Sequence, residues 1–438
     1  MAGPSLFQPG DVLVQKFGGS SMATPERILK VAERVAEQVR AGRRLVLVVS
    51  AMGDTTDELL GLMEKVNPDP APRELDQLAA TGEIVSVSIT AAALQRVGIP
   101  ARSFIAPTLG IRTDDRFGQA EIKAFERLPE LAAFVRTGGV AVVAGYQGLT
   151  PGGDLTTLGR GGSDITAVAL ARDLGQKLCE KYTDEDGVYS ADPRLIPTAR
   201  KVWHLDYAEM ETLARHGNGI LHPRAIAYAR EAAIRIHVRS SFTREEGSVV
   251  GPDGDPTHRV KSLAVDRKQA VVAIEGIRWG VERAGAGGGE PPPSAGIAIA
   301  AGVAGAGPAG ADGPAGWVKG LPFPVSAWEW RSFDGLRGSL RVGFRLADSF
   351  EAIPRLWELA DGLAAEEATF HANLAVISIV GCGLATQPDL ADRILGPLPG
   401  TGIQPVLVDR QGLRLTVAVP RETATEALGF LHQAVIAL

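Results

Sequence analysis

The most constraining feature of this chain is an alternation of apolar strand-like runs and helical segments along residues 11–250. Residues 45–49 (LVLVV) show no polar alternation, which is typical of a strand covered on both faces. Pro25 opens a segment whose apolar residues keep helical spacing. The other strands predicted here are residues 11–17, 101–105, 140–144, 177–183 and 234–238. This alternation predicts an α/β fold with a mainly parallel open sheet sandwiched by helices, which binds ligands at the carboxyl ends of its strands.

Two glycine-rich loops contain a cation, and the first of them follows a predicted strand. Residues 16–21 (KFGGSS) set a lysine beside a glycine pair, and residues 156–171 (TTLGRGGSDITAVALA) set Arg160 between glycines before an apolar helix. Glycines let backbone N–H groups approach an anion, a helix N-terminus attracts negative charge, and a guanidinium binds carboxylates or phosphates through two hydrogen bonds. The second loop has a simpler interpretation, a tight turn with Ser163 as helix N-cap and Asp164 in the first turn. The first loop is not a P-loop, because its lysine precedes the glycines.

Composition narrows the class of protein. The 438 residues carry 45 lysines and arginines against 51 acidic residues, a formal net charge of −6. With no basic block, this argues against nucleic acid or an anionic membrane as a partner. The two cysteines are far apart in the sequence, and we find no signal-peptide pattern and no apolar run long enough to cross a bilayer. We therefore expect a cytoplasmic protein. The seven histidines show no convincing metal-ligand spacing, so we predict no metal site built from protein side chains.

The pattern changes at residues 246–256 (EGSVVGPDGDP), where we expect a domain boundary. Beyond it, shorter strands alternate with helices, which predicts a smaller α+β region. The predicted strands are residues 270–274 and 340–344, and the predicted helices are residues 349–363 and 421–437.

Residues 284–316 are an unusual stretch in which 27 of 33 residues are Gly, Ala or Pro. Residues 305–310 (GAGPAG) formally match the G-x-G-x-x-G fingerprint of a dinucleotide site. No strong strand precedes this match, and Asp312-Gly313-Pro314 is expected to break a following helix. We therefore interpret the stretch as a flexible insertion.

Four ordered stretches resemble the aspartate kinases of the amino-acid-kinase superfamily. They are KFGGSS at 16–21, SAMGDTTDEL at 50–59, LGRGGSDITAVALA at 158–171 and YTDEDGVYSADPR at 182–194, with LHPR at 221–224 as a weaker fifth. The C-terminal part resembles that family's paired ACT regulatory modules, best at residues 373–383 (NLAVISIVGCG). The resemblance implies a catalytic domain at 11–250 and ferredoxin-like ACT modules at 257–366 and 367–438, through which chains form a homo-oligomer.

Members of that family use ATP to phosphorylate the side-chain carboxylate of L-aspartate, in the pathway to lysine, threonine and methionine. A carboxylate is ionised at neutral pH and needs no general base, so catalysis depends on positioning and charge stabilisation. By resemblance, Lys16 faces the transferred phosphoryl group, Asp164 orients Lys16, and Mg²⁺ is held largely by phosphates and water. The implied substrate contacts are Ser50, Thr56, Glu83 for the α-ammonium and Arg160 for the α-carboxylate. The implied ATP contacts are Lys16, Gly18, Gly19, Ser20, Thr183, Asp184, Tyr189 and Arg194.

Some assignments have simpler alternatives. Glu83 lies in a helix predicted over residues 72–97, where a charged residue usually faces solvent, and Thr56 beside Asp57 fits a helix N-cap. Two other functions also stay open: a kinase of another acidic amino acid, and a catalytically silent regulatory subunit. The joint presence of Lys16, Glu83, Arg160 and Asp164 speaks against the silent subunit.

The chain also departs from the family pattern. Relatives usually carry lysine in a G-A-K-V-L-H-P stretch near the nucleotide, whereas residues 217–223 read GNGILHP and place Gly219 at the lysine position. We therefore expect weaker ATP binding without loss of the chemistry. The first module lacks the usual proline–glycine turn, and VLVDRQGLRL at 406–415 replaces the usual Thr-Ser-Glu stretch of the second. We expect altered or absent feedback by lysine or threonine, with an amino-acid effector of some kind as the open alternative.

Overall fold

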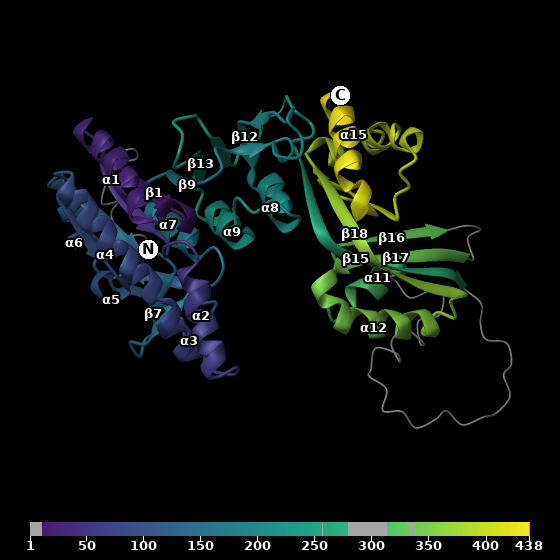
Figure 1. Ribbon diagram of the computed structural model, residues 1–438, viewed down its shortest axis with the longest axis horizontal. Coiled ribbons are helices and arrows are strands. Elements are labelled where there is room, and N and C mark those ends of the chain that lie inside the picture. Colours follow the sequence, from purple (N-terminus) through teal and green to yellow (C-terminus); the bar gives the residue numbers. More distant parts are fainter. Residues whose placement is uncertain (1–10, 256, 279–312, 333–336, 438) are drawn as a thin grey trace. The chain divides into compact units, whose positions relative to one another are not determined.

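The computed structural model describes residues 11–255, 257–278, 313–332 and 337–437 (Figure 1). The chain divides into two compact units. The first comprises Met1–Tyr189 and Arg200–His258, and the second comprises Ser190–Ala199 and Arg259–Leu438. The short segment Ser190–Ala199 thus belongs to the second unit, although its neighbours on both sides belong to the first.

An eight-stranded sheet forms the centre of the first unit, in the order β12-β14-β13-β9-β1-β2-β6-β3. The strands from β13 to β3 in this order pair in parallel, and β14 is antiparallel to β13. The bounds are β1 Val12–Phe17, β2 Arg44–Val49, β3 Ala101–Phe104, β6 Val140–Ala144, β9 Leu178–Thr183, β12 His204–Asp206, β13 Arg235–Ser240 and β14 Ser248–Gly251. The predicted mainly parallel α/β sheet is confirmed, and the carboxyl ends of its parallel strands share one edge.

Helices cover both faces of this sheet (Figure 1). On one face, α1 (Pro25–Arg40) packs with α4 (Thr81–Arg96) over apolar side chains of β1, β2 and β6. Thr24 caps α1, because its hydroxyl accepts a hydrogen bond from the Arg27 N–H. On the other face lies α7 (Gly162–Asp173), whose residues 162–171 are all buried. The remaining helices of the unit are α2 Thr55–Val66, α3 Pro72–Ala79, α5 Ala106–Leu109, α6 Leu128–Arg136, α8 Tyr207–Arg215, α9 Pro223–Glu231 and the 3-10 turn η1 Gly19–Met22.

A small four-stranded sheet, β5-β4-β7-β8, carries the chain into α7. Its strands are β4 Ile111–Thr113, β5 Ile122–Phe125, β7 Gln147–Leu149 and β8 Leu155–Thr157, and a separate hairpin pairs β10 Val188–Tyr189 with β11 Lys201–Val202. Asp76 of α3, only 3% exposed, holds this region together. Its carboxylate accepts hydrogen bonds from the Gly118 N–H, the Thr157 N–H and the Thr157 hydroxyl at 2.7–3.0 Å. The start of the loop after β8 is thereby fixed.

The second unit is built on one antiparallel sheet, in the order β16-β17-β15-β18-β20-β19. Its strands are β15 Ser262–Arg278, β16 Ala327–Ser332, β17 Arg337–Arg345, β18 Glu367–Val380, β19 Leu407–Gln411 and β20 Arg414–Pro420. Its helices are α11 Gly313–Lys319, α12 Ser349–Gly362, α13 Gly383–Thr386, α14 Leu390–Leu395 and α15 Ala424–Ile436, with 3-10 turns η2 Leu346–Asp348, η3 Leu398–Thr401 and η4 Arg421–Thr423. The predicted α+β region is confirmed; its division into modules at 366/367 stays a prediction.

Two apolar clusters support this second sheet. One groups buried residues of β15 and β17 with α12, and the other groups β18 and β20 with α14 and α15. Ala191 and Ile196 of the segment Ser190–Ala199 belong to the second cluster. Residues 284–312 of the predicted insertion lie outside the described residues. Near the end of the insertion, α11 begins at Gly313. Our expectation that Pro314 prevents a helix is therefore wrong, because proline is tolerated in the first turn of a helix.

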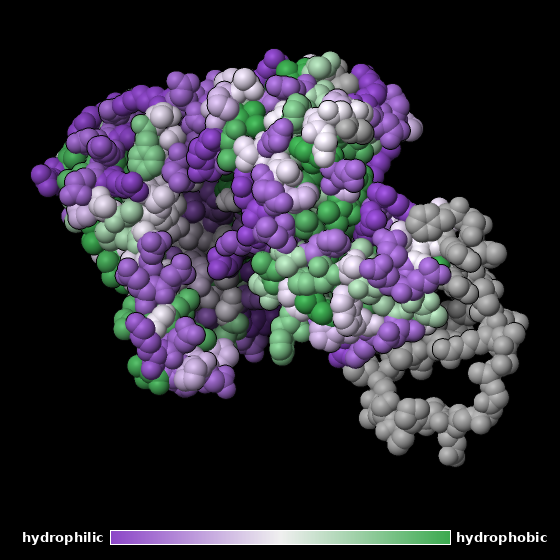
Figure 2. All heavy atoms as spheres, turned by 45° about the vertical axis from the view of Figure 1, so that its right-hand side comes forward, coloured by the Kyte–Doolittle hydropathy of each residue, from purple (hydrophilic) through white to green (hydrophobic). Residues whose placement is uncertain are grey.

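One helical stretch, Pro72–Arg96, is apolar and long enough to cross a membrane by length and composition. It consists of α3 and α4, and 56% of its most apolar window is buried inside the protein. Val87 and Leu94 of α4 pack in the core against α1 and the sheet. Because of this burial, we interpret Pro72–Arg96 as a core helical stretch, which matches the helix predicted over residues 72–97. On the face of the protein shown in Figure 2, hydrophilic and hydrophobic residues are interspersed.

Candidate active site

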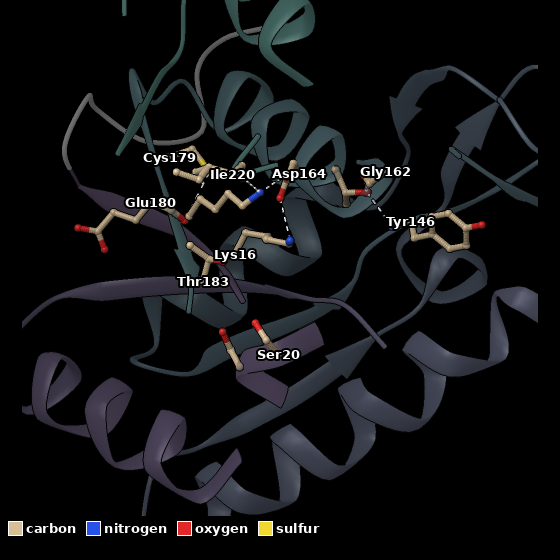
Figure 3. Close-up of polar contacts among 12 residues, drawn as sticks. Lys16, Ser20, Tyr146, Gly162, Asp164, Cys179, Glu180, Thr183 and Ile220 are labelled. Atoms are coloured by element: carbon tan, nitrogen blue, oxygen red, sulfur yellow. Dashed lines mark hydrogen bonds and ion pairs between the residues drawn. The ribbon is translucent and has the colours of Figure 1, made fainter. Parts of the chain in front are cut away.

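Three charged side chains meet between the sheet and α7 (Figure 3). Lys16, near the end of β1, places its Nζ 2.8 Å from Oδ1 of Asp164, in the first turn of α7. Lys181 of β9 places its Nζ 2.6 Å from Oδ2 of the same carboxylate and donates a second hydrogen bond to the Ile220 carbonyl at 2.6 Å. Exposed fractions of 6–9% mark all three residues as buried. The structure thus brings Lys16 and Asp164 together, and adds a second lysine.

The electrostatics of this cluster favour an anion. Burial by itself raises the pKa of Asp164, but the ammonium groups of Lys16 and Lys181 outweigh it and lower the pKa to about 2. Burial lowers the pKa of Lys181, although the carboxylate of Asp164 opposes that shift. Two ammonium groups against one carboxylate leave a net positive charge where water is largely excluded. A phosphate chain is the kind of ligand that such a cluster stabilises.

The glycine pair after Lys16 forms a close-fitting turn. The Gly18 N–H donates to the Tyr182 carbonyl at 3.1 Å, which ties the end of β1 to the end of β9. A Cβ on Gly19 would lie 3.0 Å from the Gly53 carbonyl oxygen, so a side chain there meets the loop after β2. These contacts place the loops after β1, β2 and β9 side by side, as their shared sheet edge predicts.

The residues expected to bind ATP after β9 are only partly together. The hydroxyl of Thr183 donates to Oδ1 of Asp184 at 2.8 Å, and the hydroxyl of Ser20 approaches the same oxygen at 3.4 Å. Tyr189 donates its phenolic hydrogen to Asp186 at 3.1 Å; burial, followed by the contact with Asp186, raises the pKa of Tyr189 to about 12.

Arg194 differs from the other expected ATP contacts. It lies in the segment Ser190–Ala199, which packs with the second unit, and its guanidinium binds Asp192 at 2.9–3.2 Å. Arg194 thus belongs to another unit than Lys16, Ser20 and Thr183, and its contact with ATP stays a prediction.

Glu83 is the most unusual carboxyl group of the site. It lies in the first turn of α4, is 3% exposed, and its Oε1 accepts a hydrogen bond from the Ala51 N–H at 3.0 Å. Its Oε2 is buried without a hydrogen-bond partner among the described residues. Burial raises the pKa of Glu83 to about 8, against the smaller opposing effects of the Ala51 N–H and the charge of Lys16. The solvated-face alternative is wrong, and the unpartnered oxygen suits a ligand ammonium group.

The loop after β2 surrounds Glu83 with small and polar groups. Ser50 is half-buried, and its N–H donates to the Phe17 carbonyl at 3.1 Å. Thr56 is the second residue of α2, whose N-cap position is Asp54, so the N-cap alternative for Thr56 is wrong. A Cβ on Gly82 would lie 2.8 Å from that of Ala51 and 3.5 Å from the Thr56 hydroxyl oxygen. The Thr56 hydroxyl therefore lies close to Gly82, the residue before Glu83.

The loop before α7 presents Arg160. Gly159 and Gly161 have φ angles of +72° and +77°, which glycine adopts readily, and Gly161 is the N-cap residue of α7. Ser163 lies inside the helix, so its interpretation as N-cap is wrong. Arg160 is exposed and makes no hydrogen bond or ion pair with any other residue that the structure describes. Its guanidinium is available for a ligand.

Comparison with known proteins assigns the chain to a family. Residues 11–240 match the model of the amino acid kinase family. An aspartokinase of Thermus thermophilus is 39% identical over 424 residues, which cover 97% of this chain and 98% of that protein. The chain belongs to the aspartokinase family. A second aspartokinase, from Geobacillus stearothermophilus, is 33% identical over 425 residues and covers 97% of both chains.

Solved aspartokinases share the fold. E. coli aspartokinase III in complex with aspartate and ADP superposes with a TM-score of 0.69 at 22% identity, over 97% of this chain and 100% of that one. The Clostridium acetobutylicum aspartate kinase superposes with a TM-score of 0.71 at 19% identity, again over 97% of this chain and 100% of the other.

The sequence patterns do not single out three residues that lie near this candidate site. Lys181 precedes the motif at 182–194 by one residue, and a lysine within an apolar strand was its available signal. Tyr146, at the carboxyl end of β6, has a φ of +69°, and the charges of both Glu83 and Arg160 influence its pKa, which burial raises. Strain of this kind in a non-glycine residue often accompanies a functional site. Asp76 gave no sequence signal, because an acidic residue in an amphipathic helix usually faces solvent.

Proposed function

We propose that this chain is an aspartate kinase, which transfers the γ-phosphoryl group of ATP to the side-chain carboxylate of L-aspartate and forms 4-phospho-L-aspartate. The observation that carries the proposal is a positive cluster centred on Asp164 beside a buried, unpartnered oxygen of Glu83. The first feature suits a phosphoryl group, and the second suits the ammonium group of an amino acid. Family membership supports the same reaction.

The residues divide the work between two substrates. Lys16 stabilises the transferred phosphoryl group, Asp164 orients Lys16, and the loop of Gly18, Gly19 and Ser20 surrounds the phosphates. The Gly18 N–H is used by the Tyr182 carbonyl, so Gly19 and Ser20 offer the backbone N–H groups of this loop. The other expected ATP contacts are Thr183, Asp184, Tyr189 and Arg194. Arg160 binds the α-carboxylate of aspartate, Glu83 binds its α-ammonium, and Ser50 and Thr56 complete the pocket. The aspartate carboxylate attacks without a general base, because it is already ionised.

Mg²⁺ accompanies ATP in this proposal. Among the described residues, no group of three or more His, Cys, Asp or Glu side chains is arranged to hold a metal ion. In this proposal, phosphate oxygens and water supply most of the ligands of Mg²⁺. When bound, Mg²⁺ neutralises charge on the phosphates.

The experiment that tests the reaction is a hydroxylamine trap, which converts an acyl phosphate into a coloured hydroxamate. The purified enzyme receives Mg-ATP with aspartate, with glutamate or with no acceptor. We expect hydroxamate with aspartate alone. A signal with glutamate that exceeds the signal with aspartate would assign another acidic substrate, and no signal with either would indicate a silent subunit.

The cellular setting follows from the proposed reaction. We place the enzyme in the cytoplasm, at the first step of the pathway to lysine, threonine and methionine. The α+β unit then acts as a pair of ACT-like modules that join chains into a homo-oligomer and offer a site for an amino-acid effector. Support for altered feedback comes from the sequence departure at Val406–Leu415, which forms β19 and the start of β20. Unaltered inhibition by lysine or threonine in a purified-enzyme assay would contradict it.

A further inference from the structure

Lys181 and Lys16 are direct neighbours across two parallel strands. The pairing of β1 with β9 sets Lys16 opposite Lys181, so both side chains leave the same face of the sheet from strands about 4.8 Å apart. Like charges placed opposite each other destabilise a sheet. Asp164 relieves this repulsion only in part, because one carboxylate serves two ammonium groups.

Other acidic side chains close by do not complete the neutralisation. Glu180 is adjacent to Lys181 in sequence but lies on the opposite face, where it accepts hydrogen bonds from Gln15, Tyr182 and Arg239. Glu83 is largely protonated at neutral pH in the absence of a ligand, because its pKa is about 8. Within the described part of the chain, the pair of lysines therefore retains an excess positive charge that an anion can neutralise.

The Lys181 ammonium group has an unused N–H donor for such an anion. It has three N–H donors, and two of them are used by Asp164 and the Ile220 carbonyl. The third has no acceptor among the described residues, and 11% of the side chain is exposed. The Lys181 side chain is therefore not completely enclosed.

Lys181 donates a hydrogen bond to the carbonyl of Ile220. Ile220 directly follows Gly219, the position where relatives usually carry lysine. Nothing lies within 4 Å of a Cβ added to Gly219. A lysine at 219 would therefore start one residue from the place that the Lys181 ammonium group occupies. One cation is missing from this loop, and another arrives beside it from β9.

We propose that Lys181 is a second catalytic lysine, which binds the phosphates of ATP and the phosphoryl group in transfer from β9 in place of the absent lysine at 219. The proposal rests on the kinase activity proposed above. Lys181 stays protonated and donates hydrogen bonds, while the phosphoryl group passes from ATP to the acceptor carboxylate. With this lysine in place, Gly219 no longer implies weak ATP binding.

The test compares Lys181→Met with Lys177→Met, a matched change of an exposed lysine four residues earlier. We expect kcat/KM for ATP to fall by about 100-fold to 1,000-fold in the first variant, as for other positioned transition-state donors, and to stay within about twofold in the second. The KM for aspartate should stay nearly constant in both. A merely structural role for Lys181 would change both substrates together.

The decisive arm is rescue by a lysine at 219. The double variant Lys181→Met with Gly219→Lys restores two ammonium groups beside Asp164, so we expect it to regain at least about tenfold in kcat/KM for ATP over Lys181→Met. A Lys181→Met enzyme within about threefold of the unmodified one would overturn the proposal. So would a folded double variant that regains nothing. If the single variant does not fold, the double variant is compared directly with the unmodified enzyme, and activity below about 1% overturns the proposal.

Titration calorimetry with ADP, without any acceptor, separates this proposal from the proposed reaction. We expect weaker ADP binding by Lys181→Met and recovery in the double variant. If the unmodified enzyme forms no aspartyl hydroxamate, the proposed reaction fails while the ADP comparison still decides the role of Lys181. Equal ADP affinity in the unmodified protein and a folded Lys181→Met variant would contradict phosphate binding by Lys181.

Discussion

Aspartate binding should depend steeply on pH through Glu83. The carboxyl group is 3% exposed, and burial raises its pKa to about 8. The substrate ammonium group is attracted by the ionised form and has little to bind in the neutral form. Below pH 8 the enzyme must therefore release a proton from Glu83 as aspartate binds, so affinity falls as the pH is lowered.

The size of the effect follows from the fraction of ionised Glu83. At pH 7, about one site in eleven carries the carboxylate when the pKa is about 8, which costs about 1.4 kcal/mol of binding free energy. The KM for aspartate should thus fall about ninefold from pH 6 to 7 and about fivefold from pH 7 to 8. Above pH 8 the curve should flatten, as long as the substrate amino group stays protonated.

The assay measures initial rates at saturating Mg-ATP over this pH range, with three proteins. In Glu83→Gln, an uncharged side chain of similar size should raise the KM at pH 8 and remove its pH dependence. Glu64→Gln, at an exposed glutamate of α2, serves as the matched control and should keep the slope. A flat KM between pH 6 and 8 in the unmodified enzyme, or an unchanged slope in Glu83→Gln, would refute the reasoning.

The same group affects stability with a definite sign. The folded pKa of Glu83 lies above its ordinary value, so the folded state binds the extra proton and ionisation in the fold is unfavourable. Stability of the ligand-free enzyme should therefore fall by up to about 1.4 kcal/mol per pH unit between about pH 5 and 8 through this group alone. Thermal melts of the unmodified enzyme should show a larger decrease over that range than melts of Glu83→Gln; identical trends would contradict it.

Three further substitutions test other parts of the site. Asp76→Ala leaves three donors of Gly118 and Thr157 without their acceptor, and the two donors of Thr157 are buried. We therefore expect a loss of at least about 2 kcal/mol in a denaturant titration and a higher KM for aspartate, whereas unchanged stability would argue against the clamp. Asp164→Asn removes the charge between two lysines, and kcat should fall at least about 100-fold in the coupled ADP-release assay, whereas near-normal kcat would exclude the orienting role. Gly161→Ala forces a Cβ at φ +77° to within 2.5 Å of His222, so the melting temperature and kcat/KM for aspartate should both fall.

Strands of the parallel sheet could be predicted closely, because a strand covered on both faces is an uninterrupted apolar run. The strand predicted at 140–144 coincides with β6, and the run at 45–49 lies within β2. In the second unit the strand predicted at 340–344 lies within β17, but the prediction at 270–274 covers only part of β15. Polar residues at 266–269 interrupt its apolar pattern, and there the pairing with β18 shifts register.

The site was predictable where a motif names a residue, and less so where register or burial decides. Lys16 and Asp164 came from motifs and Glu83 from the family resemblance, and the structure places both carboxyl groups within electrostatic reach of Lys16. The position of the Lys181 side chain depends on which residue of β9 pairs with Lys16. A shift of the register by one residue would have turned this side chain to the opposite face of the sheet. The orphaned oxygen of Glu83 depends on how α4 packs, which no local pattern encodes.

The segment Ser190–Ala199 limits how this chain can be divided. Ala191 and Ile196 fill the core of the second unit, although about 60 residues of the first unit follow them before Arg259 begins the remainder of the second. A recombination event or a proteolytic cut at one point near residue 258 would leave that core with a gap on one side and an unburied apolar loop on the other. Exchange of the C-terminal unit between relatives therefore demands a matching segment at 190–199.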